Sequence, residues 1–132
     1  MESSAKETRF PEMRAEIISA VSALADPAYQ ERVWLRRIYP HPQYYDDFDL
    51  NIHILYDDTT VLENPQRAIG NLLVSQQEAD ALAMLAKALQ KLFDAEGISR
   101  SDQEYMNSPC WREVVEAARQ AKQAMVDSAA DE

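Results

Sequence analysis

Phe48-Asp-Leu-Asn-Ile-His-Ile-Leu-Tyr56 is the stretch on which the predicted fold class depends, because apolar side chains recur there at every second position. This alternation is typical of a β-strand that buries one face. Asp57-Asp58 follows as a turn, and Thr59-Thr-Val-Leu62 contains enough β-branched residues to return as an antiparallel partner. The pattern therefore predicts a β-hairpin over about residues 48–62.

On both sides of this hairpin, apolar residues recur every three to four positions, which is the spacing of an amphipathic helix. Capping patterns support two of these helices, Ser75-Gln-Gln-Glu78 and Ser101-Asp-Gln-Glu104. The predicted helical segments are 11–25, 27–38, 75–96, 101–105 and a last helix that starts at Ser108-Pro109. The chain is therefore predicted to be a mainly helical α+β domain with one inserted hairpin.

One globular domain is predicted over residues 10–126, between polar ends at 1–9 and 127–132 that have little to bury and should be mobile. The N-terminal segment lacks the apolar stretch of a secretory signal, and Cys110 is the one cysteine of the chain. A lone thiol suits a reducing compartment. These features predict a cytoplasmic protein.

A count of 23 acidic against 13 basic residues gives the chain a net charge of −10. Nucleic acids and anionic membranes are bound through positive charge, so neither is expected as the main partner. No apolar run approaches the roughly 20 residues of a membrane span. Gly70 and Gly97 stand outside the glycine-rich phosphate-binding patterns, and His41 and His53 cannot form the zinc motif HExxH. No cofactor is predicted.

The negative charge is concentrated in the predicted hairpin. Residues 1–45 hold six acidic and six basic side chains, whereas residues 46–66 hold six acidic side chains and no basic one. Such a surface would attract and orient a basic protein. The plainer interpretation is a solvated strand edge whose charges prevent aggregation. The residues predicted to bind a basic partner are Asp46, Asp47, Asp57 and Asp58, with Tyr44 and Tyr45 as aromatic contacts.

A metal site is an alternative hypothesis for the same stretch. Asp49, Asn51 and His53 would project from one side of a strand, with Asp57 in line with them. Carboxylate, amide and imidazole groups are common metal ligands. This alternative predicts a metal-dependent enzyme or a metal-binding protein that uses Asp49, His53 and Asp57.

Two further hypotheses concern basic residues and oligomeric state. Arg32, Arg36 and Arg37 end the second predicted helix, where they would form salt bridges with the acidic stretch or complement the helix dipole. A small-anion site is the functional alternative for these arginines. A lone hairpin needs cover for its apolar face, and pairing with a second copy of the chain would make a structural homo-oligomer, in the simplest case a homodimer.

The segment Tyr39–Thr59, the following Val61-Leu-Glu-Asn-Pro65, and Tyr105 with Ser108-Pro-Cys-Trp111 resemble a family of small acidic bacterial proteins of unassigned function. The resemblance covers about residues 10–125. It implies an intracellular bacterial source, and it brings no activity, cofactor or catalytic residue with it. In size and acidity the chain is also similar to immunity proteins that neutralise bacterial toxins. The leading hypothesis is a non-catalytic protein-binding module, and an immunity-type inhibitor of a basic toxin is its most specific form.

Overall fold

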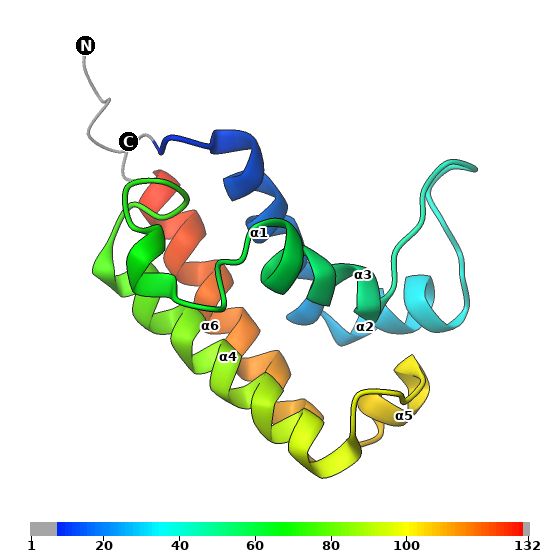
Figure 1. Ribbon diagram of the computed structural model, residues 1–132. Coiled ribbons are helices and arrows are strands. Elements are labelled where there is room, and N and C mark those ends of the chain that lie inside the picture. The colour runs from blue at the N-terminus through cyan, green and yellow to red at the C-terminus, as the bar shows by residue number, and fades with distance from the viewer. Residues whose placement is uncertain (1–7, 131–132) are drawn as a thin grey trace.

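Two long antiparallel helices form the body of the molecule in the computed structural model, which describes residues 8–130, with side chains through residue 126 (Figure 1). They are α4 (Gln76–Glu96) and α6 (Trp111–Ala130), and α1 (Pro11–Leu24) packs against α6. These elements confirm the long helices predicted from the apolar spacing. Mobility was predicted for residues 1–9 and 127–132, of which residues 1–7 and 131–132 lie outside the described residues. The last residues of α6 cover positions 127–130, and their mobility stays a prediction.

Local signals in the sequence set several helix ends. Ser101 and Glu104 form a reciprocal capping box at the start of α5 (Asp102–Met106), as their spacing predicts. Gly97 follows α4 with a φ of 88°, a backbone conformation that glycine adopts without steric cost. A short 3-10 helix, η4 (Pro65–Ala68), packs against α4. Among residues 8–130, no helix combines the length and apolar character needed to cross a membrane.

The second predicted helix is present but changes its winding. It begins as α2 (Pro27–Tyr29), where the side chain of Asp26 accepts a hydrogen bond from the Tyr29 backbone N–H at 3.1 Å. It continues as a π-helix, η2 (Gln30–Leu35), whose wider turn is closed by the bond from Arg36 N to Glu31 O at 3.0 Å. The segment therefore ends a few residues earlier than predicted.

The predicted β-hairpin at 48–62 is wrong, and so is the α+β fold class. Phe48–His53 forms helix α3, and Ile54–Asp58 continues it as a second π-helical segment, η3. Residues 8–130 contain no β-strand, although Ile69 and Leu73 form one isolated bridge. The domain is helical. The homodimer was predicted from pairing between strands, and residues 8–130 offer no strand for such pairing.

Packing explains why this stretch is a helix. Phe48 and Leu55 are seven positions apart, two helical turns, and both are buried. The strand pattern would have placed Leu55 on the polar face and Leu50 on the apolar face, yet Leu55 is 0% exposed and Leu50 is 38% exposed. Asp47 caps the helix by accepting a hydrogen bond from the Leu50 backbone N–H at 2.8 Å. The cap and the buried side chains override the β-propensity of the isoleucines.

A buried ion pair joins α1 to the start of α4. Glu78 is fully buried, and Arg14 donates to its two carboxylate oxygens at 2.8 and 2.7 Å. Glu78 also accepts a hydrogen bond from the Val74 backbone N–H at 2.9 Å. The predicted capping box at Ser75 is therefore half formed, because Ser75 receives the Glu78 N–H while the Glu78 carboxylate bonds to Arg14 and Val74.

Candidate functional site

A loop of residues 36–47, here called the projecting loop, stands out from the helical body between η2 and α3 (Figure 1). Its tyrosines contact one another: the ring centroid of Tyr39 lies 6.0 Å from that of Tyr44 and 6.2 Å from that of Tyr45. Ile38 and Tyr45 remain about half exposed, at 49% and 55%. The loop therefore presents apolar and aromatic surface to solvent.

Asp46 fixes the end of this loop from inside the protein. It is 8% exposed, and its Oδ2 accepts hydrogen bonds from Trp34 Nε1 at 2.9 Å and from the Tyr29 hydroxyl at 2.7 Å. Asn51 Nδ2 donates to its Oδ1 at 2.9 Å. Several hydrogen bonds can hold a buried carboxylate without a neighbouring base. The structure thus places Asp46, one of the predicted partner-binding residues, in the interior rather than on a binding surface.

Tyr29 extends this network to the loop. Its hydroxyl lies 2.5 Å from the Tyr44 hydroxyl and donates to Asp46. Burial, and then its hydrogen bonds to Tyr44 and Asp46, raise the pKa of Tyr29 far above its ordinary value, so the hydroxyl keeps its proton. Tyr44, predicted as a partner contact, is half-buried and serves to attach the loop.

Asp47 and Tyr45 form a second anchor closer to solvent. The Asp47 Oδ1 caps α3, and its Oδ2 accepts a hydrogen bond from the Tyr45 hydroxyl. This hydrogen bond is the main reason that the pKa of Tyr45 is raised to about 12. The Tyr45 ring is held in one position while more than half of its surface stays exposed.

The helix brings together three of the predicted metal ligands in a way that a strand would not. Asp49, His53 and Asp57 are spaced four residues apart, and His53 lies between the two carboxylates. Its Nε2 is 3.5 Å from Asp49 Oδ2 and its Nδ1 is 2.5 Å from Asp57 Oδ2. The hydrogen bond to Asp57 and the charge of Asp49 raise the pKa of His53. Asn51 instead points inward to Asp46.

The exposed acidic face consists of Asp49, Asp57 and Asp58 on α3 and η3. A protonated His53 would neutralise part of this charge, and the rest faces solvent. Across the part of the chain that the structure describes, no three histidine, cysteine or carboxylate side chains are arranged to hold a metal ion. The arrangement suits a long-range attraction to basic groups.

Arg32, Arg36 and Arg37 are exposed. Arg32 lies over the ring of Tyr29, 5.8 Å from its centroid, whereas Arg37 lines a pocket to which the other two do not contribute. Within residues 8–126, none of the three forms a salt bridge with a carboxylate. The salt bridges predicted between these arginines and the acidic stretch are therefore not found there.

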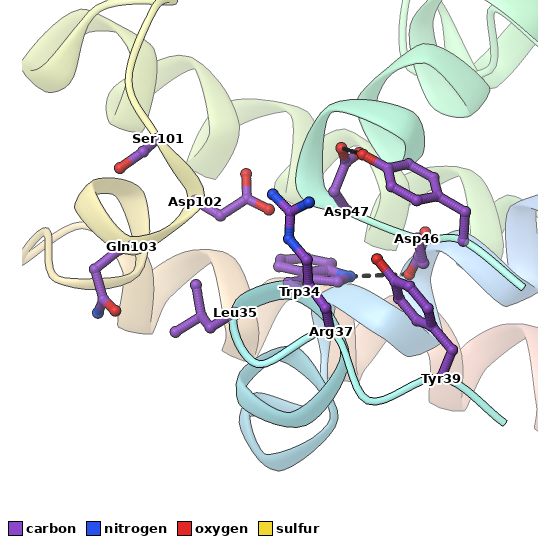
Figure 2. Close-up of a pocket in the computed structure, with 10 residues that line it drawn as sticks. Trp34, Leu35, Arg37, Tyr39, Asp46, Asp47, Ser101, Asp102 and Gln103 are labelled. Atoms are coloured by element: carbon purple, nitrogen blue, oxygen red, sulfur yellow. Dashed lines mark hydrogen bonds between the residues drawn. The ribbon is translucent and has the colours of Figure 1, made fainter. Parts of the chain in front are cut away.

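A pocket of about 340 Å³ lies at the base of the projecting loop (Figure 2). The end of η2, the loop and the start of α5 each provide one wall. Figure 2 shows the Arg37 side chain reaching toward the gap between Asp47 and Asp102. The residues lining this pocket, here called the loop pocket, are Trp34, Leu35, Arg37, Tyr39, Tyr45, Asp46, Asp47, Ser101, Asp102 and Gln103.

Asp102 is the part of the loop pocket that sequence reasoning missed. Its Oδ2 accepts a hydrogen bond from the Phe48 backbone N–H at 3.2 Å, which links α5 to the start of α3. Burial raises the pKa of Asp102, and the nearby charges of Asp47, Asp49 and Asp46 add to this effect. The capping serine before it predicts only that Asp102 starts a helix. Nothing in the sequence indicates that this position meets a segment 54 residues earlier.

Comparison with known proteins gives one match. A family model described as a domain of unknown function (DUF7945) matches residues 8–132. The chain belongs to that family. This membership confirms the part of the resemblance that predicted an uncharacterised family, while the bacterial source stays a prediction. No curated protein matches the chain, and no solved structure matches it.

Proposed function

We propose that this DUF7945 protein is a non-catalytic module that binds a basic protein through the projecting loop and the exposed acidic face. The observation that carries the proposal is the position of Tyr45, whose hydroxyl is fixed by Asp47 while 55% of its residue surface is exposed. Fixed, exposed aromatic side chains are typical of the residues that dominate protein interfaces.

Charge supports the same assignment. Asp57 and Asp58 are exposed and lie in a stretch of 21 residues, 46–66, that contains no lysine or arginine. Concentrated charge of one sign raises the rate of association with an oppositely charged protein. Because Asp46 is buried and hydrogen-bonded, it supports the loop and is not part of the exposed acidic face.

The loop is also prepared for binding before a partner arrives. Asp46 and Tyr29 hold its C-terminal end, and the bond from Ile38 N to Arg32 O at 3.0 Å holds its beginning. A loop that is already ordered loses less conformational entropy on binding. The specific form of this proposal is an immunity-type inhibitor. Such a protein must bind its toxin rapidly in the cytoplasm, which an ordered loop beside an acidic face would favour.

The test compares two double variants of the tagged full-length chain. Asp57→Asn with Asp58→Asn removes charge from the proposed surface, whereas Asp80→Asn with Glu116→Gln removes the same charge from a groove between α4 and α6. Proteins captured from the source cell are quantified, and the association rate of the main basic protein is measured at several salt concentrations. We expect the first variant to lower that rate about tenfold and to flatten its salt dependence, and the second to leave both unchanged. Equal behaviour of the two variants would overturn the proposal.

A further inference from the structure

The loop pocket is lined by more acidic than basic side chains. Asp46, Asp47 and Asp102 line it, and Arg37 is the one basic side chain among its lining residues. Within residues 8–126, none of these three carboxylates forms a salt bridge. The Oδ1 of Asp102 has no hydrogen-bond partner among the described side chains and main chain, although the residue is half-buried. The pocket therefore favours the entry of a further positive charge.

The aromatic side chains around these carboxylates point to an organic cation. Trp34, Tyr39 and Tyr45 all line the pocket, and aromatic rings attract cations through the negative charge of their faces. A small metal ion would need several free carboxylate oxygens at once. Instead, Tyr45 and the Leu50 N–H occupy the oxygens of Asp47, and three neutral donors occupy those of Asp46.

We propose that the loop pocket binds the guanidinium group of an arginine side chain supplied by the basic partner. This inference rests on the proposed function, because it names the part of that partner which the pocket holds. A planar guanidinium can stack on the tyrosine rings and still donate to a carboxylate such as Asp102. An ammonium group lacks the flat face for stacking and is more strongly hydrated.

Arg37 already shows that such a group fits at the pocket. Arg37 is one of the residues that line the pocket. Its backbone has a φ of 58°, a left-handed conformation that is uncommon for arginine. Its positive charge would compete with an incoming guanidinium. We therefore assign Arg37 as a built-in competitor that the partner's arginine displaces.

The experiment measures binding of N-acetyl-arginine amide to the ¹⁵N-labelled full-length chain. The indole N–H of Trp34 is the reporter because it donates to Asp46 beside the pocket, and the indole N–H of Trp111, which donates to Gln30, is the internal reference. We expect a saturable shift of the Trp34 signal with a dissociation constant in the millimolar range. N-acetyl-lysine amide should bind at least about threefold more weakly, and the neutral isostere N-acetyl-citrulline amide should not bind.

Two variants and one control connect the binding to named residues. Asp102→Asn keeps an acceptor for the Phe48 N–H but removes the charge, and we expect it to weaken arginine binding about fivefold. Arg37→Asn removes the competitor with a residue that tolerates a positive φ, and we expect about threefold tighter binding. Asp94→Asn, on the surface of α4, should leave binding unchanged.

The outcomes separate this inference from the proposed function. Absence of a saturable Trp34 shift, or equal binding of arginine and citrulline amides, overturns the guanidinium site even if a basic protein is captured through Asp57 and Asp58. Equal binding of lysine and arginine amides overturns the preference for guanidinium. Arginine binding that is weakened about fivefold in Asp102→Asn supports the site even if capture of a basic protein fails, and unchanged binding in that variant overturns the site.

Discussion

Glu78 and Asp46 are both buried carboxylates, but the protein balances their charges differently. Glu78 receives two hydrogen bonds from the guanidinium of Arg14, so the charge inside the helical body is neutralised. Asp46 is held by Trp34, Tyr29 and Asn51, which are neutral donors, so its negative charge remains. One carboxylate joins helices, and the other fixes a loop while adding to the negative potential around it.

This difference shows how one chain separates stability from recognition. The ion pair lies at the junction of α1 and α4, outside the acidic stretch, and its two charges neutralise each other. The Asp46 network lies at the base of the projecting loop and beside the loop pocket. Disruption of the first should therefore damage the whole fold, whereas disruption of the second should act mainly on the loop.

The largest effect is expected from breaking the ion pair. Arg14→Met leaves the Glu78 carboxylate buried without its base and should lower the free energy of unfolding by about 4 kcal/mol. Urea denaturation monitored by far-ultraviolet circular dichroism measures the change. The double variant Arg14→Met with Glu78→Leu removes both charges and should recover at least half of the loss. A double variant as unstable as Arg14→Met would show that the loss is not due to an uncompensated charge.

The packing of the continuous segment formed by α3 and η3 gives the next largest effect. Leu55→Ala opens a cavity in the core and should cost about 3 kcal/mol of unfolding free energy, whereas the exposed Leu50→Ala should cost less than about 0.5 kcal/mol. The same denaturation measurement checks both variants. Because a strand would bury Leu50 and expose Leu55, the reversed order would contradict the helical structure of this segment.

A smaller and more local effect is expected at the second carboxylate. Asp46→Asn places an amide nitrogen against donors that now bond to a carboxylate, and it should cost about 2 kcal/mol. Unlike Arg14→Met, it should increase amide hydrogen exchange in the projecting loop far more than in α4 and α6. Asp49→Asn, which removes an exposed carboxylate at the start of α3, is the matched control and should leave exchange in the loop unchanged. Equal increases of hydrogen exchange in the loop and in α4 and α6 would show that Asp46 stabilises the whole fold, as Glu78 does, and not mainly the loop.

The smallest effect concerns the exposed acidic face. The pKa of His53 is raised in the folded protein, so the stabilising contribution of its charged form is fully present below its ordinary pKa and is lost as the pH rises through the raised value. The free energy of unfolding should therefore fall slightly as the pH rises above about 6.5, the ordinary pKa of histidine, and His53→Gln should abolish that fall. His41→Gln, on the projecting loop, should retain it. If the unfolding free energy of His53→Gln depended on pH as in the wild type, groups other than His53 would be responsible for the pH dependence.

Much of the helical body could be predicted from the sequence because its signals are local. The apolar spacing of 11–24 and 76–96, the capping box at Ser101 and Gly97 after α4 all act within a few residues. The failure at 48–62 has a physical reason. Its apolar residues fit both a period of two and a helical period, and the contacts that decide between them come from α1 and from residues far along the chain.

The candidate site was predictable only in part for the same reason. Composition located the acidic stretch, and the structure leaves Tyr45, Asp57 and Asp58 exposed among the residues that were predicted to bind a partner. Their role in binding stays a prediction. Composition could not show that Asp46 is buried while Asp57 and Asp58 are exposed. The three side chains that donate hydrogen bonds to Asp46 come from α2, η2 and α3. The loop pocket depends on α5, which no local pattern connects to the loop.

The π-helical winding of η2 makes the length of that segment as important as its composition. In a π-helix each backbone hydrogen bond spans one residue more than in an α-helix. The direction of a helical side chain changes by about 100° for each residue added or removed. Loss of one residue from Gln30–Leu35 would thus allow an ordinary helix but turn Trp34 away from Asp46. The packing of neighbouring residues can adjust to a single substitution. A single deletion in this segment would instead remove the hydrogen bond from Trp34 to Asp46 that holds the loop. Family members that share this site should therefore vary in the sequence of this segment before they vary in its length.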